Sequence, residues 1–346
     1  MSTFTEQEIS ASIGPLAAAA GVLNRPARPM LSRDADAIYW MGRYVERAEH
    51  VARMLLVNAN VLIDVGDLAP RMQNRLWQNI YVVLRLEEPQ HDADKPMAEK
   101  VQRAMTFDAE NPSSLLSCLT RARENARGIR ENISAEMWEA LNTLYWSIRS
   151  DEARRKFEES PDGFWRSVMT ESMLFQGLTD QTLAHDQRWQ FTQLAKHFER
   201  ADITCRVLEV NHAMLAVSDM MAESTVRNIN WMAVLRSCCC LEAYRRSHLG
   251  DMDPLKVVAF VMLEKNYPRT VRFSVRAASE AISRIRAGVN PTSVDEAERI
   301  LGRLDAQLEY AEIGEVLDVG VPAYLEKIQF ALADAAMAVQ KAYFLH

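Results

Sequence analysis

Two short segments of the sequence place glutamate and arginine side chains where they can do chemistry. Each puts two carboxylates and an arginine on one face of a helix at 100° per residue, beside the apolar face and not opposite it. The first segment offers Glu46, Glu49 and Arg53, and the second offers Glu199, Asp202 and Arg206. Such a carboxylate can bind a divalent cation, orient an arginine towards a phosphate, or simply pair with the arginine.

The two segments are copies of one unit. Residues 44–58 (YVERAEHVARMLLVN) align without gaps on residues 197–211 (HFERADITCRVLEVN), and seven of the fifteen positions are identical. The same separation of 153 residues (197 − 44) carries an apolar seam from one copy to the other. The seam positions are Ile38, Met41, Val45, Ala48, Ala52 and Leu55, which map onto Phe191, Leu194, Phe198, Ala201, Cys205 and Leu208.

This duplication predicts two related helices, near 38–62 and 191–215, in one bundle. We expect them to pack seam to seam about a pseudo-two-fold axis, where Ala48 and Ala201 allow the backbones to approach closely. Glu46 and Glu199 would then flank one shared cleft.

Further glutamates and arginines recur outside the repeat and extend the candidate binding surface. The full candidate set is Glu46, Arg47, Glu49, Arg53, Arg123, Glu124, Asn125, Arg127, Glu199, Arg200, Asp202, Arg206, Arg236 and Glu242. The simplest interpretation is a network of ion pairs at helix edges. A second is a metal site whose oxygen ligands suit Mg²⁺ or Mn²⁺; its ligands would be Glu46, Glu49, Glu199 and Asp202. A third is the docking of a partner.

Familiar catalytic motifs are missing from the sequence. It contains no GxxxxGK[ST] phosphate loop, no GxGxxG fingerprint and no GxSxG elbow. A ferritin-like di-iron site needs two Glu-x-x-His pairs. On the expected helices, only Glu209 and His212 have that spacing, and the first copy has Leu56 and Ala59 at the matching positions. The residues alone therefore name no reaction and require no cofactor.

Composition and helix-start signals predict an all-α protein. Glycine and proline together are only 24 of 346 residues (12 + 12), and no long stretch alternates with the period of a strand. Capping residues, four of them followed by proline, mark five helix starts: Asn111-Pro112, Ser134, Ser160-Pro161, Asp253-Pro254 and Asn290-Pro291. We expect a loosely ordered extension at 1–29 and, at 30–346, a single large bundle of roughly ten helices.

Charge and cysteine usage narrow the choice of partner and of cellular compartment. A formal net charge of −7 argues against a nucleic-acid partner. No run of about 18 apolar residues predicts a membrane span, and residues 1–10 lack the basic start of a secretory signal. The five cysteines contain no CxxC pair, which favours reduced, buried thiols. We therefore expect a cytoplasmic protein.

The sequence resembles the bacterial alpha-E family in five segments that follow one another in order. They are MLSRDADAIYWMGRYVERAEHVARML (30–55), NPSSLLSCLTRARENARGIRENISAEMWEALN (111–142), WQFTQLAKHFERADITCRVL (189–208), LRSCCCLEAYRR (235–246) and YPRTVRFSV (267–275). The second copy departs from the family pattern at Ala195 and His197, where a glycine and an aromatic residue are usual.

The resemblance implies an all-helical domain whose relatives are encoded beside, or fused to, a circularly permuted ATP-grasp protein, often with a transglutaminase-like protease nearby. ATP-grasp enzymes activate a carboxylate and join it to an amine, so the resemblance implies a role in amide or peptide ligation. The leading hypothesis is a helical partner or accessory subunit that binds the ligase or presents its acceptor peptide. The alternative is a carboxylate-rich, metal-dependent hydrolase or transferase that acts on a peptide or an acyl phosphate.

Overall fold

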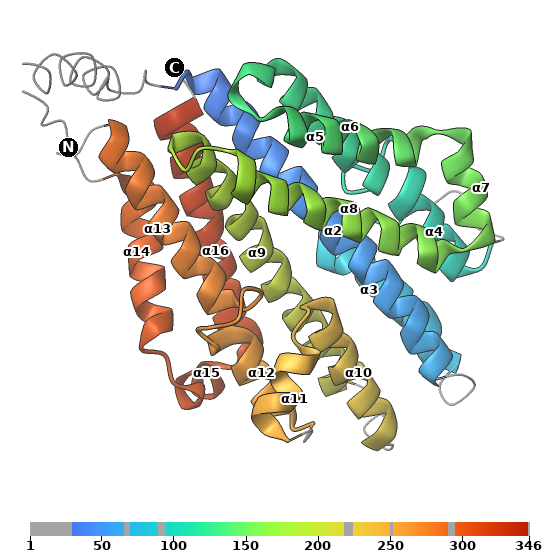
Figure 1. The fold of residues 1–346 in the computed structure, drawn as a ribbon. Coiled ribbons are helices and arrows are strands. Elements are labelled where there is room, and N and C mark those ends of the chain that lie inside the picture. The colour runs from blue at the N-terminus through green and yellow to red at the C-terminus, as the bar shows by residue number, and fades with distance from the viewer. Residues whose placement is uncertain are drawn as a thin grey trace, which may run out of the picture. The chain divides into compact units, whose positions relative to one another are not determined.

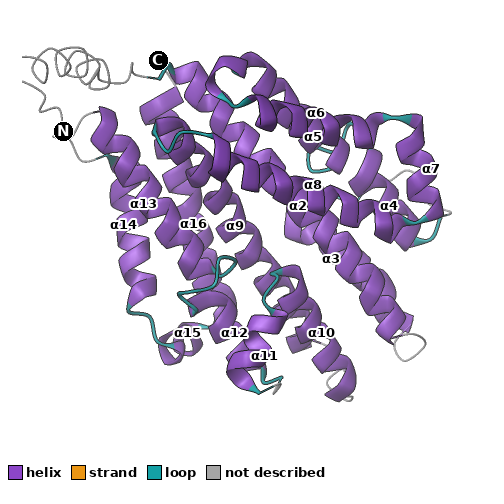
Figure 2. Ribbon diagram, viewed as in Figure 1, coloured by secondary structure: helices purple, strands orange, loops and turns teal. Residues whose placement is uncertain are grey.

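The computed structural model describes most of the chain after the N-terminal extension. The described residues are 30–65, 70–88, 95–217, 224–249, 252–289 and 295–344. Within these ranges the secondary structure is helical, and no strand is present (Figure 2). The all-α prediction is confirmed. The predicted extension at 1–29 and the predicted helix start at Asn290-Pro291 lie outside the described residues.

Two long helices carry the two copies of the repeat. Helix α2 runs over Ser32–Val65 and helix α9 over Gln187–Val217, and the two pack against each other. All twelve seam positions predicted from the sequence are buried. The apolar periodicity of each copy therefore marks the face that the helix turns towards the core.

Six helices connect α2 to α9. They are α3 (Pro70–Leu84), α4 (Met97–Phe107), α5 (Leu115–Gly128), α6 (Ala135–Arg149), α7 (Asp151–Glu159) and α8 (Pro161–Thr182), with a 3₁₀ turn at Arg130–Asn132 between α5 and α6. Helices α5 and α8 pack on α2, and α6 packs on both of them (Figure 1).

Seven more α-helices follow α9. They are α10 (Ser224–Ser237), α11 (Leu241–His248), α12 (Pro254–Leu263), α13 (Val271–Val289), α14 (Glu296–Glu309), α15 (Ile313–Val319) and α16 (Val321–Val339), and a π-helical turn, Gln340–Phe344, follows α16. Helices α13 and α16 pack on α9, and α14 packs on both of them (Figure 1). Each copy of the repeat therefore has its own pair of supporting helices.

The described chain holds fifteen α-helices, more than the roughly ten that the sequence predicted. The difference comes from short helices such as α7, α11 and α15, which span nine, eight and seven residues. Helices of two turns show too few repeats of the 3.6-residue period to stand out from their neighbours in a sequence.

Most predicted helix caps are present. The side chains of Ser134, Ser160 and Asp253 accept hydrogen bonds from the first-turn backbone N–H groups of α6, α8 and α12. The prediction at Asn111 was wrong, because α5 begins at Leu115 and Ser114 caps it. The Asn111 side chain instead accepts a hydrogen bond from the backbone N–H of Ser113, within the turn before the helix.

Helices α2 and α9 approach closely at equivalent positions of the repeat. A Cβ atom added to Gly42 would lie 3.0 Å from the Ala195 Cβ and 3.4 Å from the Thr192 carbonyl oxygen. Gly42 and Ala195 are related by the repeat (42 + 153 = 195). Equivalent positions in mutual contact lie on a pseudo-two-fold axis, as they do in an isologous dimer. The close approach lies six positions before the predicted Ala48 and Ala201, which are also buried.

Candidate functional site

The glutamates of the repeat pair with arginines of the other copy. Glu46 accepts hydrogen bonds from Arg200, with Nε 2.7 Å from Oε1 and Nη2 3.0 Å from Oε2. Glu199 accepts from Arg47 in the same two-pronged way, at 2.5 Å and 3.0 Å. Because Glu46 corresponds to Glu199 and Arg47 to Arg200, the pseudo-two-fold axis exchanges one pair for the other. The two Glu-Arg dipeptides thus clamp α2 to α9.

We call Glu199 with its partners the Glu199 half of this arrangement, and Glu46 with its partners the Glu46 half. In the Glu199 half, a second arginine also binds the carboxylate. Arg43 donates from Nε to Glu199 Oε2 at 2.7 Å and from Nη1 to the Tyr39 hydroxyl at 2.9 Å. Burial alone would raise the pKa of Glu199, but Arg47 and Arg43 outweigh it and lower that pKa to about 2. Glu199 therefore carries its negative charge at neutral pH. The two arginines keep some exposure, 13% for the Arg43 side chain and 21% for that of Arg47.

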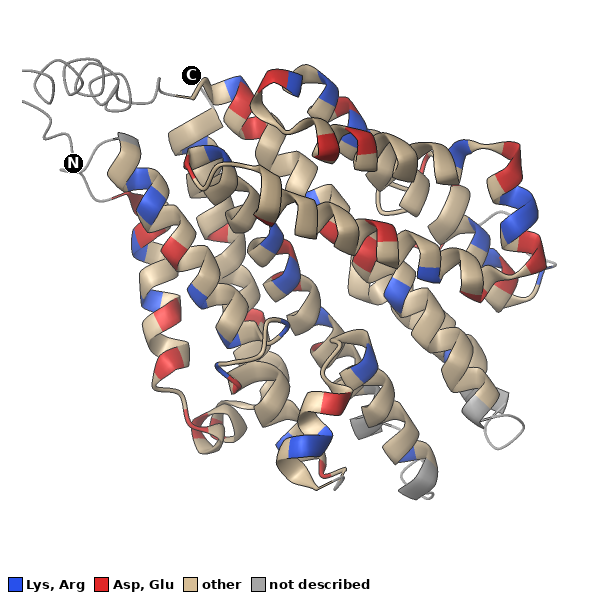
Figure 3. Ribbon diagram, in the orientation of Figure 1, with Lys and Arg blue, Asp and Glu red and all other residues tan. Residues whose placement is uncertain are grey.

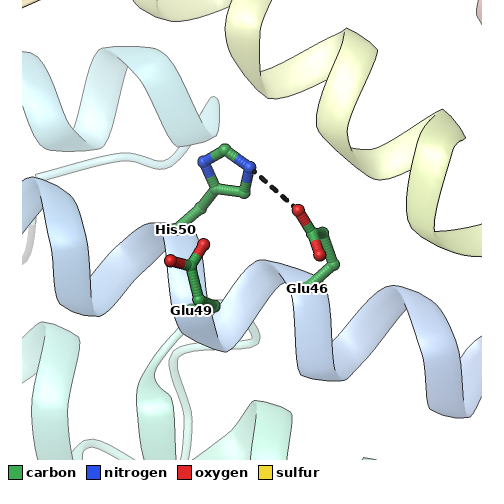
Figure 4. Close-up of side chains that lie close together, drawn as sticks. All are labelled: Glu46, Glu49 and His50. Atoms are coloured by element: carbon green, nitrogen blue, oxygen red, sulfur yellow. Dashed lines mark ion pairs between the residues drawn. The ribbon is translucent and has the colours of Figure 1, made fainter. Parts of the chain in front are cut away.

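The Glu46 half holds its carboxylate with more partners. Besides Arg200, Glu46 has Arg269 Nη1 and His50 Nε2 each 3.3 Å from Oε1, and Gln176 Nε2 3.3 Å from Oε2. Figure 4 shows Glu46 and His50 one turn apart on α2, with the imidazole directed at the carboxylate. Burial opposes the charge, yet Arg200 and Arg269 hold the pKa of Glu46 well below its usual range.

Residues 268–269, just before α13, cover the side chains that hold Glu46. The carbonyl of Pro268 accepts from Arg200 Nη1 at 3.1 Å, and that of Arg269 accepts from the Thr204 hydroxyl at 3.4 Å. The side chains of Arg200 and Arg269 are only 9% and 11% exposed. Arg269 also donates to Glu49 Oε2 at 2.7 Å, and Arg53 pairs with the same carboxylate. Residues 268–269 therefore cover the ion pairs of this half.

The structure departs from symmetry at Lys196. This residue corresponds to Arg43 (43 + 153 = 196), but within the described chain Glu46 is held by Arg200, Arg269, His50 and Gln176 and not by Lys196. Lys196 is buried, and burial together with Arg200 lowers its pKa to about 8. Among the described residues no carboxylate is bonded to this amine, so the fold tolerates the Lys196 charge without an ion pair there.

We refer to the interlocked side chains as the ER cluster. Its members are Arg43, Glu46, Arg47, Glu49, Arg53, Glu199, Arg200, Asp202, Arg206 and Arg269. Six arginines face four carboxylates, so the cluster carries an excess of two positive charges (6 − 4). Basic and acidic positions are interspersed along α9 (Figure 3). Burial and the nearby Arg269 also lower the pKa of Arg53. This direction agrees with the excess of positive charge in the cluster.

The four predicted metal ligands do not meet at one point. Within the described residues, one acid-containing group has its possible ligand atoms within 4.8 Å of one another, and it consists of Glu46, Glu49 and His50. Asp202 instead pairs with Arg206 at 2.6 Å, and Glu199 pairs with two arginines. Arginines also bind the oxygens of Glu46 and Glu49. Mg²⁺ and Mn²⁺ need such oxygens as ligands, so these residues do not fit the predicted metal site.

The other predicted site residues lie outside the ER cluster. Arg123 on α5 donates to Asn142 at 2.8 Å and lies 4.7 Å from the ring centroid of Tyr145. Exposed i,i+3 pairs account for three more predicted residues, because Glu124 pairs with Arg127 and Glu242 pairs with Arg245. The remaining two are Asn125, whose amide donates to the Arg121 carbonyl, and the half-buried Arg236 on α10.

Sequence reasoning missed several residues of the site. Arg43 carries a signal in hindsight, because it lies one turn before Arg47 on the same face of α2. Arg269 belongs to the segment 267–275 that carried the family resemblance, but nothing in that segment indicates that it reaches Glu46 and Glu49. Gln176 on α8 has no sequence signal at all.

Comparisons with known proteins agree with the family resemblance. Residues 30–344 match the model of the Alpha-E family, described as a predicted alpha-helical domain with a conserved ER motif. Uncharacterised proteins of Mycobacterium bovis and Mycobacterium tuberculosis are each 22% identical over 313 residues, which is 84% of this chain and 34% of theirs. The chain thus spans about a third of the length of these curated relatives.

No solved structure matches the chain. In the described part of the chain, none of the helices is long and apolar enough to cross a membrane. The two Glu-Arg dipeptides at the centre of the ER cluster accord with the motif in the family description. Since the family model covers nearly all of the described chain, the protein belongs to the Alpha-E family.

Proposed function

We propose that this protein is a helical partner of an ATP-grasp-type amide or peptide ligase, which it binds or supplies with its acceptor peptide. The observation that carries the proposal is the reciprocal Glu–Arg pairing, which makes the repeat a rigid clamp between α2 and α9. The identity of the partner rests on the family resemblance. The role belongs in the cytoplasm, where ATP is available.

The chemistry of the ER cluster favours binding over catalysis. A general base needs an available lone pair and a pKa near the working pH. Both oxygens of Glu46 and of Glu199 accept hydrogen bonds, and arginines hold both pKa values far below neutrality. His50 is buried, and burial lowers its pKa although Glu46 opposes the change. None of these three groups is poised to transfer a proton.

The relatives support a domain that works beside others. They share 313 aligned residues with this chain, yet these residues are only about a third of their length. A helical unit that occurs within much longer chains is suited to a role in which neighbouring domains, or a separate partner, perform the reaction. We propose the circularly permuted ATP-grasp protein as that partner, with the transglutaminase-like protease as a second.

A binding experiment tests the proposal. The protein is co-expressed with a circularly permuted ATP-grasp protein from the same genome, with a tag on one of them. The eluted complex is sized by light scattering with and without ATP. We expect a complex of defined stoichiometry, and an ATP-grasp protein from an unrelated system serves as the control. Absence of a complex under both conditions would contradict the proposal.

The alternative, a metal-dependent hydrolase or transferase, would have to use Glu46, Glu49 and His50, whose possible ligand atoms lie within 4.8 Å of one another. Titration calorimetry with Mn²⁺, and separately with Mg²⁺, distinguishes the two functions. The arginine contacts to these carboxylates predict no saturable binding. A site that binds Mn²⁺ in the unaltered protein and is lost in Glu49→Gln would favour the alternative.

A further inference from the structure

We infer a binding pocket for a small organic phosphate between helices α4, α5, α6 and α7. The cavity there has a volume of about 420 Å³, within the range of small-molecule sites. Three arginines from three different helices line it, Arg121 on α5, Arg149 on α6 and Arg154 on α7, and no acidic side chain does. The inference goes beyond the proposed function and does not depend on it.

The three arginines differ from those of the ER cluster in their partners. Each is held by an aromatic ring: Arg121 lies 5.7 Å from the centroid of Tyr44, Arg149 lies 5.5 Å from that of Tyr145, and Arg154 lies 5.5 Å from that of Phe107. Arg149 also donates a hydrogen bond to the Tyr145 hydroxyl. None of the three forms an ion pair with a carboxylate among the described residues. Stacking on a ring orients a guanidinium and leaves its N–H groups available to a ligand.

The neighbouring residue Arg155 shows that the missing ion pairs are a local feature. Helix α7 carries acidic and basic residues side by side (Figure 3), and Arg155 pairs with Glu152 at 2.5 Å. Arg154, one position earlier, lines the cavity, and no described carboxylate pairs with it. The chain as a whole has a net charge of −7. A pocket lined by three arginines and no acidic side chain attracts anions even on a protein of net negative charge.

The lining of the pocket selects the class of anion. A guanidinium matches phosphate oxygens in a two-pronged fashion, and three of them balance a ligand with two or three negative charges. Phe107, Leu116 and Ile148 supply an apolar wall, and Thr120 adds a hydroxyl group. An organic phosphate, with a compact charged end and an apolar or aromatic remainder, satisfies both surfaces.

An aromatic ring links the pocket to the Glu199 half of the ER cluster. Tyr44 on α2 lies between Arg121, at 5.7 Å from its centroid, and Arg47, at 5.9 Å. Arg47 in turn holds Glu199. A ligand bound at Arg121 would therefore be connected to the Glu199 half of the cluster through the Tyr44 side chain alone.

Titration calorimetry with inorganic pyrophosphate tests the pocket. The variants are Arg149→Gln and Arg154→Gln, and the matched control is Arg155→Gln on the same helix. All three residues are exposed, so the variants are expected to fold. We expect saturable binding to the unaltered protein and to the control, about tenfold weaker binding in each pocket variant and none in the double variant. No binding to the unaltered protein, or an equal loss in Arg155→Gln, would overturn the inference.

A second titration, with citrate, separates phosphate recognition from general attraction of anions. Citrate carries a comparable charge on carboxylates. Tighter binding of pyrophosphate than of citrate at the same ionic strength supports a phosphate site. Equal or tighter binding of citrate would overturn the assignment to phosphates, since bulk electrostatics alone would then explain the affinity.

Discussion

The two halves of the ER cluster use the same Glu–Arg pair in different surroundings. Glu46 is held by four side chains under residues 268–269, whereas Glu199 is held by two arginines that keep contact with solvent. In the Glu46 half, burial and Arg269 lower the pKa of Arg200 although Glu46 raises it. In the Glu199 half, Glu199 raises the pKa of Arg47 despite burial.

This difference separates the structural role from the site of interaction. The duplicated pair sets the packing of α2 on α9 in both halves, so the clamp itself explains why both copies retain Glu-Arg. The Glu199 half has the most exposed of these arginines, since the Arg47 side chain is 21% exposed against 9% for Arg200 and 11% for Arg269. Through Tyr44 it also adjoins the arginine-lined pocket. We therefore propose that the Glu46 half stabilises the fold, and that the Glu199 half lies beside the interaction surface.

The largest expected effect is the loss of the Glu46 carboxylate. Glu46→Ala leaves buried cations without their counter-charge, which typically costs about 3–5 kcal/mol of unfolding free energy. Glu199→Ala should cost less, because Arg43 and Arg47 can turn towards solvent. Urea denaturation measures both, with the exposed Glu242→Ala, whose side chain is 77% exposed, as a control near zero. A gain in stability for Glu46→Ala would indicate a site for a cation or a partner instead of a clamp.

Acid sensitivity tests the Glu199 half. The pKa of Glu199 falls from its ordinary 4.5 to about 2 in the folded protein. The stabilisation that it provides is therefore complete above pH 4.5 and is lost as the pH falls towards 2, by about 3 kcal/mol in total. Glu199→Gln should flatten the stability profile in this window, as followed by urea denaturation at a series of pH values. An unchanged slope in the variant would mean that other carboxylates control acid unfolding.

The Lys196 position, where symmetry breaks, should respond in the opposite direction. Burial holds the pKa of Lys196 near 8, below its ordinary 10.5, so the charged amine destabilises the fold at neutral pH. Lys196→Met should gain about 1–2 kcal/mol at pH 7, whereas Arg43→Met should lose stability. The gain should shrink as the pH rises from 8 to 10.5, because the lysine then becomes neutral in the folded state first. Destabilisation by Lys196→Met at pH 7 would reveal a partner for the charged amine.

The smallest effect concerns the contact on the axis. A methyl group at Gly42 would press against Ala195, which costs about 1–3 kcal/mol in a packed interface, while alanine gains up to about 1 kcal/mol in helix propensity. Gly42→Ala should therefore lose about 1 kcal/mol net. The swapped variant Gly42→Ala with Ala195→Gly should recover most of this loss, since the axis exchanges the two positions. Thermal melts of Gly42→Ala, Ala195→Gly and the swapped double variant provide the measurement, and purely additive losses would contradict the contact.

The Alpha-E resemblance and the all-α fold could be predicted from the sequence because both depend on local patterns. The seam from Ile38 to Leu55 and its copy from Phe191 to Leu208 repeat with the helical period, and every predicted position is buried. Caps at Ser134, Ser160 and Asp253 are equally local, since a side chain there bonds to its own first turn. The cap prediction at Asn111 was wrong because an asparagine side chain can also accept a hydrogen bond within a turn, as it does here from Ser113.

The sequence by itself determined which faces of α2 and α9 are apolar and that glutamate and arginine lie at their edges. Only the tertiary structure decided which arginine each glutamate meets. Within one helix, Glu49 can reach Arg53 four residues on, but Glu46 finds Arg200 only after α2 and α9 dock at Gly42 and Ala195. Pairing across helices depends on their register and crossing point, which the packing of the whole bundle sets and no local pattern encodes.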